Sequence, residues 1–168
     1  MQGSRLQRLS VLIVDDNQNM RELIRAILQA FGIVNIYDGR DGEHGITKIR
    51  DFSIDLVITD WVMEPQDGLD LIKWVRTSPD SPDSFLPIIM VTGHTEKARI
   101  TEARDAGINE FMAKPVSAKS LYRRLVSVIE HPRQFVRTKT YFGPDRRRKV
   151  QPFEGPNRRT NAAGADAT

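Results

Sequence analysis

The sequence predicts an α/β fold in which helices cover both faces of a parallel β-sheet. Short apolar runs alternate five times with segments whose apolar residues recur at helical spacing. The runs are apolar at consecutive positions, which is typical of strands buried on both faces of a parallel sheet. Strict alternation of strands and helices with short connections argues for this architecture.

The first strand–helix pair shows the change of period most clearly. Residues 11–14 form a continuous run rich in β-branched side chains, and we expect a strand there. Apolar residues then recur at helical spacing over 20–31. Asp16 or Asn17 is suited to cap this helix, and Gly32 to end it.

The other elements are predicted in the same way, from apolar period and from stop residues. They are expected as a strand over 34–37 with Asp38-Gly39 as a turn, a weak helix over 46–52, a strand over 56–59, a helix over 69–75, a loop over 77–87, a strand over 88–91, a helix over 96–106 ended by Gly107, a strand over 110–113, and a helix capped by Ser117 that ends near His131.

Composition and charge divide the chain into two parts. We expect one domain over 9–131, after a frayed lead-in, and a flexible Gly-, Pro- and Arg-rich tail over 132–168. Residues 1–131 carry 16 Lys and Arg against 19 Asp and Glu, whereas residues 132–168 carry 9 against 3. The net charge of +3 therefore comes from the tail.

Two absences narrow the class of protein. The sequence has no cysteine, which excludes disulfides and thiolate metal sites and fits a cytoplasmic location. It also has no apolar run near the roughly 18 residues of a membrane span and no signal peptide, so we expect no membrane partner.

Reactive side chains follow several of the predicted strands. Asp15 and Asp16 come after the first strand, Asp60 after the third, Thr92 after the fourth and Lys114 after the fifth. Because parallel strands end at one edge of a sheet, we expect these groups to meet there, where open α/β folds bind ligands. Three crowded carboxylates require a neutralising cation, and Mg²⁺ suits such ligands. We therefore interpret Asp60 as a nucleophile that accepts a phosphoryl group, with Lys114 offsetting the developing charge.

Several short motifs, in this order, resemble the response-regulator receiver domain of two-component signalling. They are Val14-Asp15-Asp16, Asp60 with Met63 and Asp67-Gly68, Val91-Thr92-Gly93, and Ala106-Gly107 with Phe111 and Lys114-Pro115. The resemblance covers about residues 9–131. It implies a flavodoxin-like (βα)5 fold with strand order 2-1-3-4-5.

The resemblance also implies a role for each matching residue. Asp60 would be the phospho-acceptor, and Mg²⁺ would be held by Asp60, Asp15, Asp16 and the backbone carbonyl of Val62. Thr92, Lys114 and Phe111 would bind the phosphoryl group or switch with it, and the Lys114-Pro115 bond would be cis. One departure is Glu64, which displaces the usual proline of this loop by one residue.

The implied function is that of a single-domain response regulator rather than an enzyme. A histidine kinase or histidine phosphotransfer protein would phosphorylate Asp60 reversibly. The signal would then pass to an unnamed protein through the face made by the fourth helix, fifth strand and fifth helix. An Mg²⁺-dependent aspartyl phosphatase of the haloacid-dehalogenase type is disfavoured, because Asp15 and Asp16 are adjacent and do not form its Asp-x-Asp motif.

The tail contains a repeat that leaves a second function open. Its two copies, 141–147 and 153–159, both follow the pattern aromatic-x-Gly-Pro-[Asp/Asn]-Arg-Arg. The twin arginines Arg146, Arg147, Arg158 and Arg159 suit carboxylates or phosphates. The tail could be disordered, or it could bind a protein partner or the receiver itself. Alternatively, the receiver could switch a nucleic-acid-binding regulator whose output is this basic tail.

Overall fold

The computed structural model describes residues 5–93 and 97–147. Its main sheet has five parallel strands in the order β2-β1-β3-β4-β5, which confirms the predicted fold class and strand order. The elements are β1 (Ser10–Val14), α2 (Gln18–Ala30), β2 (Asn35–Gly39), α3 (Gly42–Asp51), β3 (Leu56–Thr59), α4 (Gly68–Thr77), β4 (Ile88–Thr92), α5 (Lys97–Ala106), β5 (Glu110–Ala113), α6 (Ala118–Glu130), β6 (Phe135–Arg137) and β7 (Phe142–Pro144).

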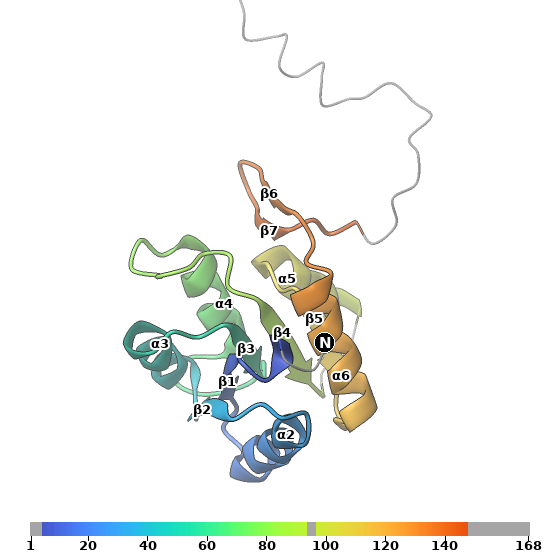
Figure 1. Ribbon diagram of the computed structural model, residues 1–168. Coiled ribbons are helices and arrows are strands. Elements are labelled where there is room, and N and C mark those ends of the chain that lie inside the picture. The colour runs from blue at the N-terminus through green and yellow to red at the C-terminus, as the bar shows by residue number, and fades with distance from the viewer. Residues whose placement is uncertain (1–4, 94–96, 148–168) are drawn as a thin grey trace, which may run out of the picture.

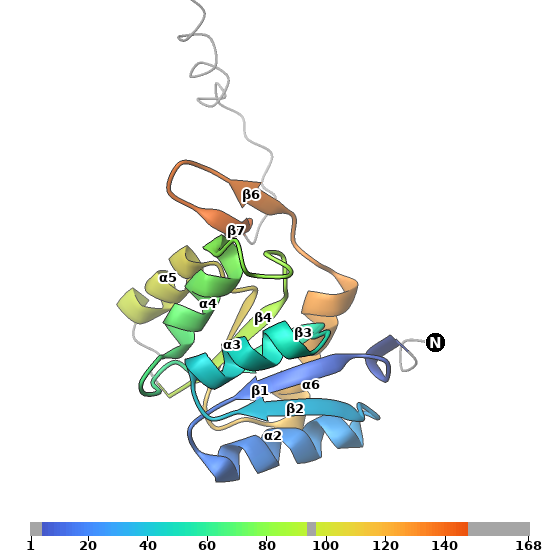
Figure 2. The same cartoon turned by 90° about the vertical axis from the view of Figure 1, so that its left-hand side faces the viewer.

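The sheet lies between two layers of helices (Figures 1 and 2). Helices α2 and α6 cover one face, and α3, α4 and α5 cover the other. Successive strand residues point to opposite faces, so Ile13 and Ile58 pack under α2 and α6 while Leu12 and Val57 pack under α3 and α4. Both faces are therefore buried, which is why the strands are apolar at consecutive positions.

Polar residues at the ends of the strand–helix loops start four of the helices. Each accepts a hydrogen bond from a backbone N–H of the first helical turn, and the four caps are Asn17, Asp41, Asp67 and Ser117. Asn17 rather than Asp16 caps α2, which leaves the Asp16 side chain free of this role. In the described chain no helix has the length and apolar character needed to cross a membrane.

Two local predictions are wrong. Asp38-Gly39 is not a turn but the end of β2, which pairs with β1 along its whole length. Arg25 forms an ion pair with Asp38 at 2.7 Å and so supports the extended backbone. The lead-in is also more than a frayed end over its described part, because Leu6 and Leu9 are buried in the core under α2 and α6.

A buried arginine joins the amino ends of β4 and β5 to α4. The guanidinium of Arg76, only 4% exposed, donates to the carbonyls of Gly107, Ser84 and Leu86 and to the Asn109 side chain, at 2.7–2.9 Å. Burial lowers the pKa of Arg76 to about 10, so the group remains charged at neutral pH. The hydrogen bonds to four acceptors offset the cost of burying that charge.

Residues 135–144 form a hairpin that was not predicted. Strands β6 and β7 pair antiparallel, and the hairpin lies against α4 beside the end of α5 (Figures 1 and 2). Tyr141 is buried, and its hydroxyl donates to the carbonyl of Pro144 at 2.6 Å. The expected flexible tail is thus ordered structure over its described part, while residues 148–168 lie outside the described chain. The domain boundary at residue 131 stays a prediction.

The hairpin fits closely against the loop that ends α5. Gly107 ends that helix with a φ of +104°, a conformation that favours glycine. Gly143 of β7 lies against it, since a Cβ on Gly143 would come within 2.9 Å of the Gly107 Cα atom. The Arg76 guanidinium also lies over the Phe135 ring of β6, 5.0 Å from the ring centroid.

Candidate functional site

Three carboxylates converge at the carboxyl edge of the sheet. Asp15 follows β1 and Asp60 follows β3, and these neighbouring strands are in register so that Val14 pairs with Thr59. Asp16 comes next along the chain. One carboxylate oxygen from each of Asp15, Asp16 and Asp60 lies within 4.8 Å of the others. This carboxylate cluster is therefore a direct consequence of parallel strand pairing.

Asp60 is held firmly at the centre of the cluster. The residue is 9% exposed, and its Oδ1 accepts the backbone N–H of Trp61 at 2.7 Å. Its Oδ2 accepts a hydrogen bond from Lys114 Nζ at 3.2 Å. Gly68, the first residue of α4, packs so tightly here that a Cβ would collide with the Asp60 carbonyl oxygen. The carboxylate is therefore oriented before any ligand arrives.

Asp15 lies deeper than Asp60. Its Oδ1 accepts the backbone N–H of Asn17 at 2.9 Å, and its Oδ2 pairs with Lys114 at 3.3 Å. Burial raises the pKa of the Asp15 carboxyl above its usual value. The Asn17 hydrogen bond opposes that rise and the charge of Asp60 adds to it, so the net direction is upward. The charged form of Asp15 is thus disfavoured by its surroundings.

Lys114 brings a positive charge to the two buried carboxylates. It follows β5, and its backbone N–H donates to the carbonyl of Thr92 at 3.0 Å, which continues the pairing of β5 with β4. Burial alone lowers the pKa of Lys114, but Asp60 and Asp15 together outweigh burial and raise it. The ammonium is therefore stable at neutral pH. The Lys114-Pro115 peptide bond is cis, as expected.

The structure also places the three remaining receiver residues named above. Thr92 ends β4 and is fully buried. Phe111 lies opposite Met90 in the β4–β5 pairing and is half-buried, so its ring lies on the same face of the sheet as Thr92. Val62 has an exposed side chain, and the role expected of it concerns its backbone carbonyl. The roles of these residues stay predictions.

The donor set of the carboxylate cluster fits Mg²⁺. Each of the three aspartates offers an oxygen, and hard oxygen ligands are those that Mg²⁺ prefers. The three carboxylates exceed the single charge of Lys114, and burial, with a smaller contribution from the charge of Asp60, raises the pKa of Asp15. A divalent cation would offset this excess. Asp15, Asp16, Asp60 and the Val62 carbonyl are the groups that would hold it.

Of the four arginines of the tail repeat, the structure describes the two in the first copy. Arg146 forms an ion pair with Asp105 of α5, and Arg147 forms one with Asp145 at 2.6 Å. In the first copy of the repeat both arginines therefore pair with carboxylates of the chain itself. Arg158 and Arg159 of the second copy lie outside the described residues.

Sequence reasoning missed the contacts of Trp61 beside the site and those of Arg76 at the opposite, amino ends of the strands. Trp61 is buried in the core, its backbone N–H donates to Asp60, and its ring centroid lies 5.5 Å from the Arg99 guanidinium of α5. Arg76 was not singled out at all. A signal for Arg76 did exist, because it lies at helical spacing from Leu69 and Ile72 on the apolar stripe of α4.

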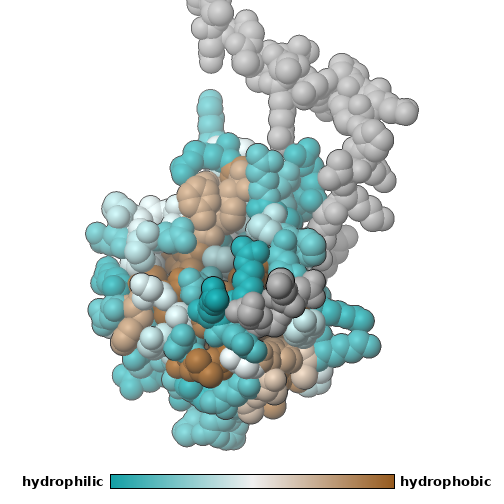
Figure 3. Space-filling model, viewed as in Figure 1, coloured by the Kyte–Doolittle hydropathy of each residue, from teal (hydrophilic) through white to brown (hydrophobic). Residues whose placement is uncertain are grey.

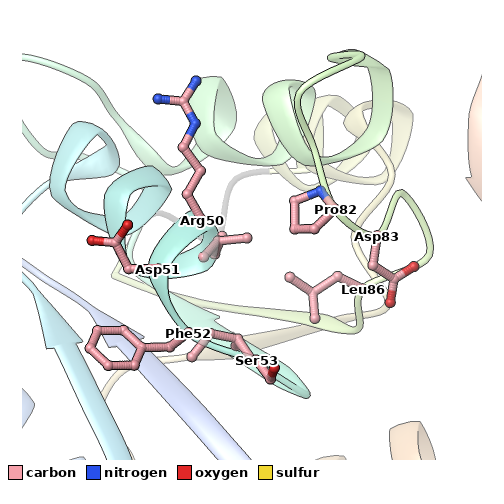
Figure 4. A pocket seen from close by; sticks show the side chains of 9 residues that line it. Arg50, Asp51, Phe52, Ser53, Pro82, Asp83 and Leu86 are labelled. Carbon is pink, nitrogen blue, oxygen red and sulfur yellow. The ribbon is translucent and has the colours of Figure 1, made fainter.

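A hollow elsewhere on the molecule has no comparable chemistry. It holds about 280 Å³ and lies between the end of α3 and the loop before β4 (Figure 4). Its lining includes Arg50, Asp51, Phe52, Pro82 and Asp83, at the amino end of β3 and β4. It is therefore remote from the carboxylate cluster, and the candidate site is defined by its charged groups rather than by a cavity.

Comparisons with known proteins agree with this geometry. The family model described as "Response regulator receiver domain" matches residues 11–126. The chemotaxis protein CheY-3 of Vibrio cholerae is 32% identical over 124 residues, which cover 74% of this chain and 94% of that protein. CheY of Pseudomonas aeruginosa is 33% identical over 122 residues, which cover 73% and 97%.

Solved structures give the same result. The structure of Vibrio cholerae CheY4 is similar with a TM-score of 0.66 at 27% identity, covering 72% of this chain and 98% of that one. A putative response regulator from Chloroflexus aurantiacus has a TM-score of 0.66 at 26% identity, covering 73% and 99%. The family match ends before β6 and β7, so the hairpin lies beyond it.

Proposed function

The chain belongs to the response regulator receiver domain family, and we propose that it carries a signal through reversible phosphorylation of Asp60. Receiver domains are signalling proteins, and they bind Mg²⁺ at an acidic aspartate cluster. The observation that carries the proposal is the meeting of Asp60 with Asp15, Asp16 and Lys114 at one edge of the sheet.

In the proposed reaction, an Asp60 oxygen attacks the phosphorus of a phosphodonor. A new O–P bond forms while the bond from phosphorus to the donor's leaving atom breaks, and the leaving group keeps the electron pair. Lys114, already 3.2 Å from Asp60 Oδ2, moves its hydrogen bond to a phosphoryl oxygen and offsets its charge. Asp15, Asp16, Asp60 and the Val62 carbonyl would hold Mg²⁺, which would supply further neutralisation of the developing charge. Hydrolysis of the acyl phosphate restores the carboxylate.

The output of the reaction is a change of surface. The Thr92 hydroxyl, at the end of β4, binds the new phosphoryl group, and the Phe111 ring moves inward on the same face of the sheet. The face formed by α5, β5 and α6 is thereby remodelled for a protein partner. The phosphodonor is a histidine kinase or a histidine phosphotransfer protein. The absence of cysteine supports the cytoplasm as its compartment.

One labelling experiment tests this proposal. The purified chain is incubated with a small-molecule phosphodonor, with Mg²⁺ or with a chelator, and incorporated phosphate is measured. Wild type should label with Mg²⁺, whereas Asp60→Asn should not. Asp51→Asn changes an exposed aspartate at the end of α3 and should label as wild type does. Equal labelling of Asp60→Asn and wild type would contradict the proposal.

A further inference from the structure

Among the side chains that the structure describes, helix α5 buries fewer than any of the other helices. Of the residues 99–106, whose side chains are described, Ala103 is buried and the others are half-buried or exposed. By contrast, α4 buries Leu71, Ile72 and Val75 among others, and α6 buries three large residues. The position of α5 therefore depends on what holds its two ends.

Arg99 of α5 contacts Trp61, the residue that follows the phosphorylation site. The guanidinium of Arg99 lies 5.5 Å from the centroid of the Trp61 ring. Trp61 directly follows Asp60 and donates its backbone N–H to Asp60 Oδ1. One buried aromatic residue therefore contacts both Asp60 and α5.

The C-terminal end of α5 is held by the hairpin. Arg146 forms an ion pair with Asp105 in the last turn of α5, and its guanidinium also lies over the Tyr141 ring at 4.5 Å. Gly143 lies directly against Gly107, the residue after the helix. Arg133, which precedes β6, donates to the carbonyl of Asn109. These contacts fix the end of α5 from outside the receiver core.

Aromatic packing keeps the hairpin in this position. The rings of Phe85, Phe135 and Phe142 lie with their centroids 5.0–5.5 Å apart. They bring together the loop before β4, β6 and β7, and an apolar patch framed by hydrophilic residues is visible at this end of the molecule (Figure 3). Helix α5 thus contacts Trp61, the neighbour of Asp60, through Arg99 and the hairpin through Asp105.

We propose that the docked hairpin is a built-in restraint that holds α5 in the arrangement of unmodified Asp60 and so opposes the phosphorylated state. The inference rests on the proposed function and extends it to a segment beyond the family match. In this structure the hairpin is docked while both oxygens of Asp60 are bound by groups of the chain, Trp61 and Lys114. Because coupling between two sites is reciprocal, phosphorylation loosens the hairpin as much as the hairpin opposes phosphorylation.

The test uses the full chain with beryllofluoride and Mg²⁺ as a phosphoryl mimic. Arg146→Ala removes the ion pair to α5, and Gly143→Val forces a side chain against Gly107. Arg147→Ala is the matched control, because it removes the same charge next door but pairs with Asp145 rather than with α5. Hydrogen–deuterium exchange reports docking of residues 135–144, and a titration reports the affinity for beryllofluoride.

The restraint predicts a specific pattern of results. Arg146→Ala and Gly143→Val should exchange faster over 135–144 and bind beryllofluoride about two- to fivefold more tightly, the scale of losing one exposed ion pair. Arg147→Ala should match wild type, and beryllofluoride should speed exchange of the hairpin in wild type. Arg146→Ala lies on the surface and remains informative if Gly143→Val does not fold.

Three results would overturn the inference. They are an undocked hairpin with unchanged affinity, weaker affinity in the two variants, or hairpin exchange that neither variant alters. The proposed function fails separately, and takes the restraint with it, if wild type binds no beryllofluoride. If wild type binds it and Asp60→Asn does not, while the variants equal Arg147→Ala, the restraint alone is wrong.

Discussion

Asp15 is almost fully buried, and its charge is a cost to the folded chain without metal. Burial and the neighbouring Asp60 raise the pKa of its carboxyl. Asp15→Asn removes that charge but keeps an oxygen for the Asn17 N–H, and Lys114 retains Asp60. We expect the variant without metal to be more stable by about 1–2 kcal/mol, or a thermal midpoint about 3–8 °C higher. Thermal unfolding in a chelator measures this.

The pH dependence of that difference follows from the direction of the pKa shift. A carboxyl with a raised folded-state pKa favours folding when protonated, and this contribution is lost as the pH rises through the folded-state value. The difference in stability between Asp15→Asn and wild type should therefore increase as the pH rises from about 4 towards 7. Mg²⁺ should reduce this difference by stabilising wild type more than the variant. A stability difference that is independent of pH would show that the buried charge of Asp15 is not its source.

Arg76 is a second residue whose effect can be predicted. Arg76→Met leaves the carbonyls of Gly107, Ser84 and Leu86 without their donor, so we expect a loss of about 3–5 kcal/mol in urea unfolding. Arg76→Lys should rescue little, because an ammonium cannot match the planar fork of hydrogen bonds.

The control for Arg76 is another arginine on the surface. Arg50→Met removes an exposed side chain that forms a 3.9 Å ion pair with Asp80 and lies 5.3 Å from the Trp74 ring centroid, and it should lower stability by less than about 1 kcal/mol. Equal losses in Arg76→Met and Arg50→Met would mean that the buried hydrogen bonds carry no net stability.

Polar residues at the ends of strands could be placed from the sequence, but the hydrogen-bond partners of Arg76 and Trp61 could not. Parallel pairing brings Asp15 and Asp60 together whenever the strands are assigned correctly, so their meeting follows from the element order. Arg76 looked like an ordinary helix residue, because its partners are backbone carbonyls far along the chain. Trp61 acts through its backbone N–H, which no side-chain motif reveals.

At the scale of elements, the hairpin is the part most open to test. A chain ending at residue 132 lacks the buried Tyr141 ring, the Phe135 ring over Arg76 and the hydrogen bond from Arg133 to Asn109. We expect it to be less stable by about 2 kcal/mol than a chain ending at residue 147, the scale of burying one aromatic side chain.

Urea midpoints of the two truncations measure this difference against the full chain. The chain ending at residue 147 should behave as the full chain does, since it keeps every contact described for the hairpin. Identical midpoints for both truncations would mean that the hairpin adds nothing to the receiver fold.

The hairpin could not be predicted because it is stabilised by contacts with residues that are distant in the sequence. Strands β6 and β7 have three residues each, too few for an apolar period to show. Their stability depends on the close contact of Gly143 with Gly107 and on the aromatic contact with Phe85. The central strands were predictable because they are buried on both faces, and such burial requires apolar residues at consecutive positions of the sequence.

The whole molecule combines an acidic receiver with a basic extension. Residues 132–168 carry 9 Lys and Arg against 3 Asp and Glu, which kept nucleic-acid binding open as an alternative. Arg146 and Arg147, however, pair with Asp105 and Asp145. We therefore expect the full chain to bind labelled DNA or RNA weakly, and to lose that binding between about 50 and 200 mM salt.

A gel shift of the full chain and of the two truncations checks this expectation. Tight binding that survives 200 mM salt and disappears in the chain ending at residue 132 would favour a nucleic-acid output instead. The arginines of the second repeat, Arg158 and Arg159, would then become the residues to substitute.

The central claim is that one carboxylate, Asp60, carries the phosphoryl group. The most direct measurement is peptide mapping of wild type after reaction with a phosphodonor and Mg²⁺, with the acyl phosphate trapped chemically before digestion. We predict that the trapped group lies on Asp60 and that Asp15, Asp16 and the exposed aspartates remain unmodified. A trapped group on any other residue, or none at all while Mg²⁺ is bound, would contradict the account.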